Sequence, residues 1–331
     1  MNVLLSTDSA LPSAYYGGTE RVLLSLAYAL NKMRHNVTIV SKFVFECSYA
    51  NTLSYTDPDL SKKIKKENID IIHDHGCTFV EFANIPTLHT IHGNSYSTDA
   101  EFHINSVFVS KNHAARMCSD AYVYNGLNWD SLYPDVDLSK KRCFFHFLGK
   151  AAWKVKNISS AINIIKKTKN SKLVVLGGNR LNFKMGFRFT LSRKIKFKGM
   201  VTDQVKSFWM SQSKGLLFPV RWYEPFGLAI IESLYFGCPV FGSRYGSLPE
   251  LVSDDTGFLS NCDSSLRHAL SNASTFNKRH LHEYARDCFN SDEMAKNYIS
   301  YYEVLLNGKT INKIKPKVKY EYRNKYLEWE V

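Results

Sequence analysis

The stretch GLLFPVRWYEPFGLAIIESLYFGCPVFGS, residues 215–243, decides the fold that we predict for this chain. Its first six residues form an apolar strand pattern, and CPVFGS at its end forms a second one. Between them, an apolar helix pattern begins near Phe226 or Gly227. A strand, a helix and a strand joined by short links predict parallel pairing of the two strands.

The same alternation extends outward along the chain. We expect strands within 2–6, 37–42, 66–76, 86–93, 105–111, 121–126, 143–149 and 172–178, and helices within 17–36, 158–168, 203–213 and 294–307. Two such series predict an α/β chain of two doubly wound, parallel-sheet domains. We place the first domain at 1–138, the second at 139–292, and a last helix with a basic tail at 293–331.

The composition narrows the class of protein. Hydrophobic residues make up 44% of the 331 residues, which is enough for two buried cores. No apolar run approaches the ~20 residues that span a bilayer, and the N-terminus lacks the basic start and apolar stretch of a signal peptide. The seven cysteines are scattered without a CxxC pair, so neither a disulfide framework nor a zinc site is indicated. We therefore expect a cytoplasmic protein.

The net charge of +13 either keeps the chain soluble or attracts an anionic partner. No nucleic-acid-binding motif accompanies the charge, which argues against nucleic acid. Residues 309–331 hold seven basic and three acidic residues among tyrosines and a tryptophan, and Lys62, Lys63, Lys65 and Lys66 form a second basic group. These groups are either solvated faces or a surface for the anionic inner face of the cytoplasmic membrane.

The opening stretch also predicts a binding site. Ligands of open α/β sheets bind beyond the carboxyl ends of the strands, where the loop with Glu224 lies. The next helix exposes the N–H groups of Phe226, Gly227 and Leu228, which suit an anion, and carries Glu232 further along. Two acids on either side of an anion site suit a nucleoside-diphosphate sugar. The alternative is an ordinary helix whose two glutamates are merely N-terminal and partly exposed.

Two common nucleotide motifs are absent. The chain has neither a G-x-G-x-x-G fingerprint nor a Walker A loop, which disfavours an NAD oxidoreductase and a P-loop kinase.

The residues behind the two glutamates carry a family resemblance. Glu224-Pro-Phe-Gly227 and Glu232 are followed by Gly237-x-Pro-Val240 and by a segment with Gly246, Pro249 and Glu250. This pattern resembles the E-x7-E signature of glycosyltransferase family 4, the retaining enzymes of the GT-B fold. The resemblance implies two Rossmann-like domains facing a cleft, with a C-terminal helix crossing back to the first domain.

The resemblance also implies an activity. We expect a hexosyltransferase that moves a sugar from a nucleoside-diphosphate sugar to a hydroxyl of a glycan or glycolipid, as in lipopolysaccharide or polysaccharide biosynthesis. It favours a UDP-sugar over a GDP-sugar, and implies neither a metal nor a tightly bound cofactor. A nucleotide-sugar epimerase of the same architecture and a non-catalytic nucleotide-sugar-binding protein stay open as alternatives.

Residue roles in the second domain follow from the same resemblance. Glu232 would hold the ribose and Glu224 the donor sugar. Lys150 stands where the family has an arginine of a diphosphate clamp, and the second cation is Lys156 or Lys154, of which we favour Lys156. Gly199, Met200 and Val201 would meet the nucleobase.

The first domain contributes further candidates. Gly17 and Gly18 open its first helix and would approach the donor phosphates, while Thr19 is either a cap or a cleft residue. In TLHTIHG, His92 matches the family histidine near the donor sugar. His73 and His75 lie two apart on one side of a strand, but no third metal ligand is evident, so we treat His75 as a cleft candidate. Asn125 belongs either to a turn or to the segment before the linker.

Overall fold

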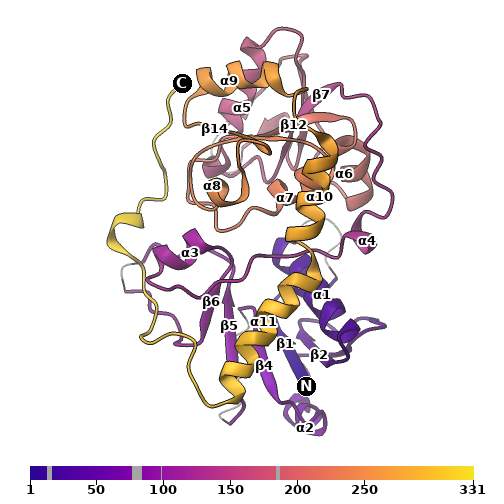
Figure 1. Ribbon diagram of the computed structural model, residues 1–331, viewed down its shortest axis with the longest axis vertical. Helices are drawn as coiled ribbons and strands as arrows, with labels where there is room; N and C mark the ends of the chain where they lie inside the picture. The colour runs from indigo at the N-terminus through magenta and orange to yellow at the C-terminus, as the bar shows by residue number, and fades with distance from the viewer. Residues whose placement is uncertain (13–16, 77–83, 98, 184–186) are drawn as a thin grey trace. The chain divides into compact units, whose positions relative to one another are not determined.

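The computed structural model describes residues 1–12, 17–76, 84–97, 99–183 and 187–331, which form two compact units (Figure 1). Unit 1 comprises Met1–Trp129 and Phe289–Arg323, and unit 2 comprises Asp130–Cys288 and Asn324–Val331. The short helix α4 (Trp129–Leu132) lies where the chain leaves unit 1. No helix within these described ranges is long and apolar enough to cross a bilayer.

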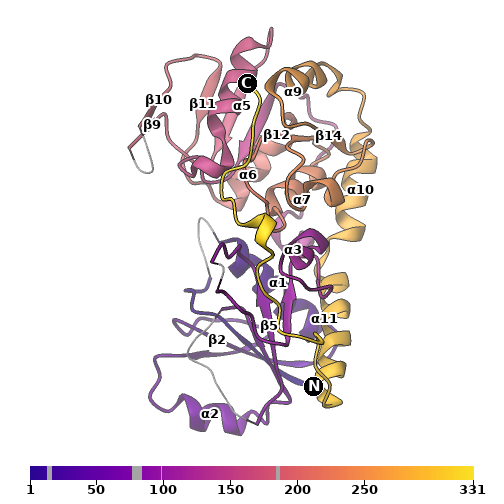
Figure 2. The ribbon, with the colours of Figure 1, turned by 90° about the vertical axis from the view of Figure 1, so that its left-hand side faces the viewer.

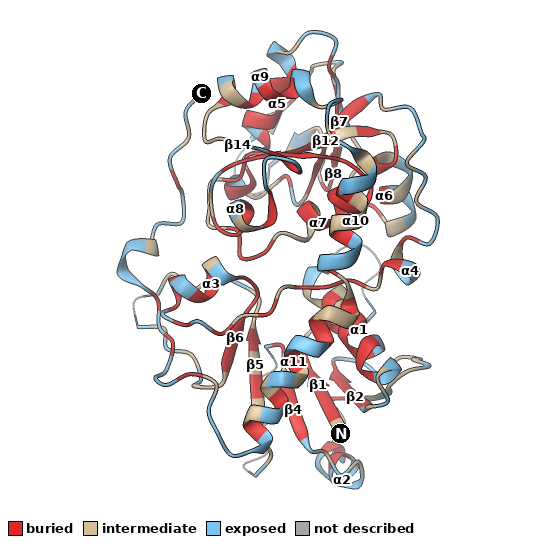
Figure 3. Ribbon diagram, in the orientation of Figure 1, coloured by how far each residue is buried: buried red, intermediate tan, exposed pale blue. Residues whose placement is uncertain are grey.

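Unit 1 is built on a parallel sheet of six strands in the order β3-β2-β1-β4-β5-β6. Its strands are β1 (Asn2–Ser6), β2 (Asn36–Ser41), β3 (Asn51–Ser54), β4 (Ile71–Asp74), β5 (Thr87–Ile91) and β6 (Ser106–Phe108). Its helices are α1 (Gly18–Lys32), α2 (Leu60–Lys66), α3 (Lys111–Arg116), α11 (Ser291–Leu306) and the 3-10 turn η3 (Tyr320–Tyr322). The central strands are buried almost throughout (Figure 3), as a sheet covered on both faces requires.

The last helix belongs to unit 1. The Asn290 side chain caps α11 by accepting a hydrogen bond from the backbone N–H of Glu293. One stripe of α11, including Met294, Tyr298 and Tyr302, is buried where the helix packs on α1 and β5. The helix that we expected at 294–307 is therefore present and braces the first sheet.

The prediction of a strand at 121–126 is wrong. This segment meets β6 only through an isolated bridge between Phe108 and Tyr122. Its alternating pattern instead reflects packing, because Ala121, Val123 and Asn125 are buried without a continuous ladder.

Unit 2 repeats the architecture with the order β11-β8-β7-β12-β13-β14, again all parallel. Its strands are β7 (Phe144–Leu148), β8 (Leu173–Leu176), β11 (Ile195–Phe197), β12 (Ser213–Phe218), β13 (Val240–Gly242) and β14 (Gly257–Leu259), with a small hairpin of β9 (Leu181–Asn182) and β10 (Arg188–Phe189). Its helices are α5 (Ile158–Lys167), α6 (Asp203–Met210), α7 (Leu228–Tyr235), α8 (Leu248–Leu251), α9 (Asp263–Ala269) and α10 (Lys278–Cys288), with 3-10 turns η1 (Lys154–Lys156) and η2 (Leu270–Asn272).

Both sheets have the same topological switch point. In each, the chain starts at a central strand, builds outward on one side and then crosses to the other, so that β1 lies beside β4 and β7 beside β12. Ligands of such sheets bind beyond the carboxyl ends of the strands at this point. The loops after β7 and β12 are therefore the expected place for a ligand in unit 2.

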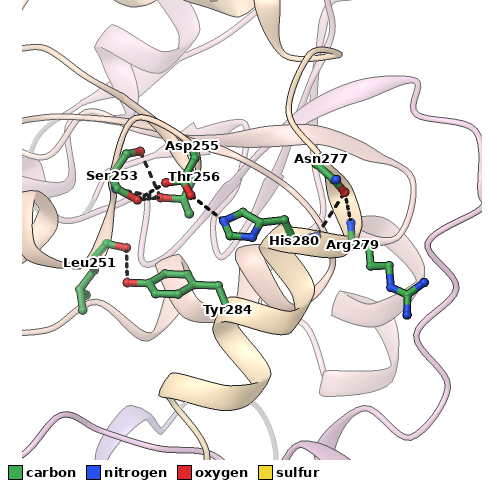
Figure 4. A network of polar contacts seen from close by, with 8 residues as sticks. All are labelled: Leu251, Ser253, Asp255, Thr256, Asn277, Arg279, His280 and Tyr284. Carbon is green, nitrogen blue, oxygen red and sulfur yellow. Dashed lines mark hydrogen bonds and ion pairs between the residues drawn. The ribbon is translucent and has the colours of Figure 1, made fainter.

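Polar contacts fix α10 against the loop after α8 (Figure 4). The Asn277 side chain accepts hydrogen bonds from the backbone N–H groups of Arg279 and His280 at the helix start. His280 contacts Asp255 at 2.6 Å, and the Tyr284 hydroxyl donates to the Leu251 carbonyl. These contacts explain how a helix with few buried residues stays in place.

Candidate active site

The loop after β12 holds a buried ion pair. Lys156 Nζ lies 2.5 Å from Glu224 Oε2, and the Trp222 indole N–H donates to the same oxygen at 2.7 Å. Both charged side chains are buried, with 7% of Lys156 and 6% of Glu224 exposed. The ammonium also lies 4.7 Å from the centre of the Trp222 ring. Of the two lysines considered for this position, Lys156 faces the glutamate, whereas Lys154 is exposed.

The helix start beside Glu224 depends on a glycine. Gly227 has φ of +89° and is the N-cap of α7, which begins at Leu228, one or two residues after the start near Phe226 or Gly227 that we expected. A Cβ at Gly227 would lie 2.9 Å from Ile230 Cδ1 and 3.2 Å from Glu224 Cγ. Only glycine accommodates both the left-handed backbone and this close approach.

The Gly246 segment supports the Glu224 loop from behind. A Cβ at Gly246, where φ is +67°, would lie 2.2 Å from the backbone nitrogen of Glu224. The backbone N–H of Ser247 donates to the Glu224 carbonyl at 3.0 Å, and its hydroxyl donates to the Phe226 carbonyl at 2.5 Å. The glycine and its neighbours thus fix the loop's path by backbone contact.

The second glutamate lies in a separate buried network. Glu232 Oε1 accepts hydrogen bonds from Lys206 Nζ at 2.8 Å and from the Tyr133 hydroxyl. Lys206 also pairs with Asp203 at 2.5 Å, one turn earlier on α6. Only 3% of Glu232 is exposed. The sequence analysis did not identify Lys206 and Tyr133, because no local pattern distinguishes them from other lysines and tyrosines.

Glycines bring the loops after β7, β8 and β11 together. A Cβ at Gly177 would lie 2.2 Å from the Gly149 carbonyl oxygen, and Gly177 N–H donates to the Gly199 carbonyl at 2.7 Å. Met200 and Val201 follow directly, so the candidates for the nucleobase lie in the loops adjoining Lys150. Lys150 is exposed, with its ammonium 5.2 Å from the Trp153 ring centre.

In unit 1, Gly17 is the N-cap of α1 and Gly18 its first residue. Thr19 is the second residue of the helix and is therefore not its N-cap. Asn125 is buried, and its side-chain oxygen has no hydrogen-bond partner in the described part of the chain.

Two histidines pair at the carboxyl ends of β4 and β5. His75 Nδ1 lies 2.8 Å from His92 Nε2, and the two rings stack with centres 5.1 Å apart. Burial lowers the pKa of His92 to about 4. Burial, with smaller effects of His73 and His92, holds the pKa of His75 well below its usual range. Both rings are therefore neutral near pH 7, and a single proton occupies the hydrogen bond between them.

His73 lies on the same side of β4 as His75 and faces the core of unit 1. Its two nitrogens lie 2.7 Å from the Tyr302 hydroxyl and from Thr90 Oγ1, and Thr90 in turn contacts Tyr298. This network anchors α11 to the sheet, so His73 has a structural role. In the described ranges, no three His, Cys, Asp or Glu side chains group as a metal site.

A comparison with known proteins finds a family model similar to part of unit 2. Residues 143–273, which include Lys150, Lys156, Glu224 and Glu232, match the family model described as Glycosyl transferases group 1. Residues 143–273 are therefore similar to a glycosyltransferase domain, and the two parallel-sheet units have the GT-B fold.

Sequence relatives are distant. An uncharacterized glycosyltransferase of Methanocaldococcus jannaschii is 26% identical over 298 residues, covering 74% of this chain and 81% of the relative. An uncharacterized 41.2 kDa protein in the cps region of Klebsiella pneumoniae is 26% identical over 176 residues, covering 50% of this chain. That match spans about half of the Klebsiella protein, 48% of its length.

Solved structures share the fold of this chain at low sequence identity. AviGT4, involved in avilamycin A biosynthesis, matches with a TM-score of 0.73 and 17% identity over 93% of this chain and 99% of its own. Anabaena HepE in complex with UDP-glucose matches with a TM-score of 0.64 and 14% identity, over 93% of this chain and 100% of its own. WaaG, involved in lipopolysaccharide biosynthesis, matches with a TM-score of 0.57 and 13% identity, over 92% of this chain and 98% of its own.

Proposed function

We propose that this chain is a glycosyltransferase that moves a hexose-type sugar from a nucleoside-diphosphate sugar to a hydroxyl of a glycan or glycolipid, with retention of anomeric configuration. The observation that carries the proposal is the buried Lys156–Glu224 pair beside the Gly227 start of α7, at the switch point of unit 2 and within the region that matches the glycosyltransferase family model. HepE, which shares the fold, binds UDP-glucose, and WaaG acts in lipopolysaccharide biosynthesis. These relatives favour a UDP-sugar as donor and a cell-surface glycan or glycolipid as acceptor.

In this proposal the leaving diphosphate is neutralised by cations and backbone dipoles. Transfer breaks the bond between the anomeric carbon and the diphosphate oxygen and forms one to the acceptor oxygen. Lys156 can donate to Glu224 and to the diphosphate at the same time, because an ammonium has three N–H donors and Glu224 occupies only one of them. The start of α7 adds N–H groups, and the exposed Lys150 adds a positive charge. Glu224 would hold the donor sugar.

The remaining roles concern the nucleoside and the first unit. Glu232 would accept the ribose hydroxyls while retaining Lys206, since a carboxylate has about four acceptor positions. The backbone of Gly199–Val201 would meet the base. In unit 1, Gly17 and Gly18 would approach the phosphates, and a neutral His92 would contact the sugar. Thr19, His75 and Asn125 would lie near the bound substrates.

A thermal-shift screen with UDP-, GDP- and ADP-sugars tests the donor. A ligand present at about 100 times its dissociation constant adds about 2.7 kcal/mol to the stability of the folded state, so the preferred donor should raise the melting temperature clearly. Glu232→Gln should reduce the shift given by the UDP-sugar more than Glu250→Gln, a matched glutamate on α8. Equal shifts in both variants would contradict the ribose assignment.

Product analysis tests the reaction. With donor and a glycan acceptor, nuclear magnetic resonance of the product should show the anomeric configuration of the donor. Without acceptor, we expect slow hydrolysis only. A sugar with an inverted ring carbon in that reaction would instead establish an epimerase, and bound but unreacted donor with every acceptor would favour a non-catalytic binding protein.

We also propose a cytoplasmic protein whose basic tail lies on an anionic membrane surface. Asn312, Pro316 and Val318 anchor the tail to unit 1, while the intervening lysines are exposed: Lys313, Lys315, Lys317 and Lys319. Because the anchors are part of the fold, replacing these four lysines with serine is a cleaner test than truncation. Loss of binding to anionic vesicles would support a membrane contact of the tail, and unchanged binding would contradict such a contact.

A further inference from the structure

The β9–β10 hairpin of unit 2 has its apolar side turned to solvent. Leu181, Phe183, Phe187, Phe189 and Leu191 alternate along its two arms and are each 44% to 76% exposed. Phe189 pairs with Leu181 across the strands, and the rings of Phe183 and Phe187 lie 5.8 Å apart. We call these five side chains the hairpin face.

The opposite side of the hairpin is polar and faces the protein. Arg188 pairs with Asn182 across the strands and lies over the Phe197 ring at 5.0 Å, while Thr190 is buried. Arg180 donates to the Thr190 and Ile195 carbonyls, which ties the hairpin to the edge strand β11. A half-buried hairpin normally places its apolar side inward, so this arrangement is inverted. An exposed apolar cluster of this kind indicates a surface that is covered by something else.

The surrounding charge indicates what covers it. The hairpin lies in a sequence segment without acidic residues, since between Asp137 and Asp203 the chain has 17 basic residues and no acidic one. Arg193 and Lys196 are exposed near the hairpin, and Lys198 lies 4.3 Å from the Trp209 ring centre. Large exposed apolar side chains with basic residues nearby and no acidic residue in the segment match the chemistry of an anionic bilayer, whose headgroups lie above its acyl chains.

We propose that the hairpin face inserts into the interface of an anionic lipid bilayer, with the neighbouring lysines and arginines on the lipid phosphates. Figure 2 shows β9 and β10 on the outer side of β11, where other strands of the unit do not cover them. The bridge between Gly178 and Gly199 links the base of the hairpin to the candidate nucleobase loop. The docked hairpin therefore holds the donor side of unit 2 at the membrane. This docking is separate from the tail and does not depend on the donor or acceptor.

Co-sedimentation with vesicles tests the proposal. The full chain should bind vesicles of phosphatidylcholine containing about one third phosphatidylglycerol, and bind pure phosphatidylcholine at least about tenfold more weakly. Phe183→Ser with Phe187→Ser should lower the partition coefficient about 100-fold, because two buried phenylalanine side chains are lost from the lipid. Both side chains are more than 70% exposed, so the melting temperature should not change.

The matched control is Phe43→Ser with Val44→Ser, which removes two side chains of unit 1 that are 55% and 63% exposed. This control should bind vesicles like the wild type, and an equal loss in both variants would contradict a specific hairpin site. Unchanged partitioning of the hairpin variant would overturn the proposal, as would loss of binding only in the variant with serine at the four tail lysines. If sedimentation equilibrium instead shows a dimer that the hairpin variant dissociates, with no vesicle binding, the face joins two copies of the chain and the bilayer proposal fails.

Discussion

At the scale of single residues, burial changes how the glutamates must be tested. Glu224 and Lys156 lie in contact with little exposure, so removing one charge leaves the other buried without its partner. Such a loss costs about 3–5 kcal/mol, whereas replacing both partners by neutral groups of similar size is often tolerated. A loss of activity in Glu224→Ala alone could therefore reflect unfolding rather than chemistry.

We predict that Glu224→Ala lowers the free energy of unfolding by about 3–5 kcal/mol, and that Lys156→Met combined with Glu224→Gln restores most of it. Sugar transfer should stay low in the double variant, because both proposed substrate contacts are gone. Urea unfolding and initial transfer rates provide the two measurements. Recovery of transfer together with stability would show that the pair has only a structural role.

At the scale of elements, the start of α7 is set by one glycine. Gly227 has positive φ and lies against Ile230 and Glu224. An added methyl group would therefore strain the backbone and also collide with these two side chains. Gly308 also has positive φ, at +70°, but nothing lies within 4 Å of the position that a methyl group would take there, which makes it a matched control.

We predict that Gly227→Ala reduces stability by about 1–3 kcal/mol and weakens nucleotide binding about tenfold, because the helix N–H groups and Glu224 move together. Gly308→Ala should cost only the backbone strain of about 1–2 kcal/mol and leave nucleotide binding unchanged. Titration calorimetry with UDP compares the two variants. Equal affinities would show that the anion does not use this helix start.

At the scale of the whole molecule, the C-terminal segment serves both units in turn. After α11, Asn312 accepts and donates hydrogen bonds within unit 1, and the chain then reaches unit 2. There the Leu327 backbone N–H donates to the Arg221 carbonyl, and Arg221 Nε donates to the Leu327 carbonyl. Trp329 packs against the core of β7, β8, α5 and α9. The Trp329 indole N–H also donates to Asp263 at 2.8 Å.

We predict that removing residues 324–331 destabilises unit 2 by about 2–5 kcal/mol, because a buried leucine and a packed tryptophan are lost. Unit 1 should keep its stability, since its own anchors remain. Hydrogen exchange followed by mass spectrometry separates the two effects. Lys325→Ser with Tyr326→Ser changes only exposed side chains of the same segment and should leave exchange unchanged. Equal loss of protection in both units after truncation would contradict the prediction.

The sequence by itself determined the α/β class, most strands and helices, and the loop with Glu224 and Gly227. These features depend on local periodicity and on backbone conformations that few residues allow, so they can be predicted from adjacent positions. Only the tertiary structure decided the contacts of Lys156 with Glu224 and of Tyr133 with Glu232, which lie 68 and 99 residues apart. It also decided that Lys154 is exposed and that the β9–β10 hairpin is inverted. Such contacts depend on the order in which strands join the sheet, which no local pattern specifies.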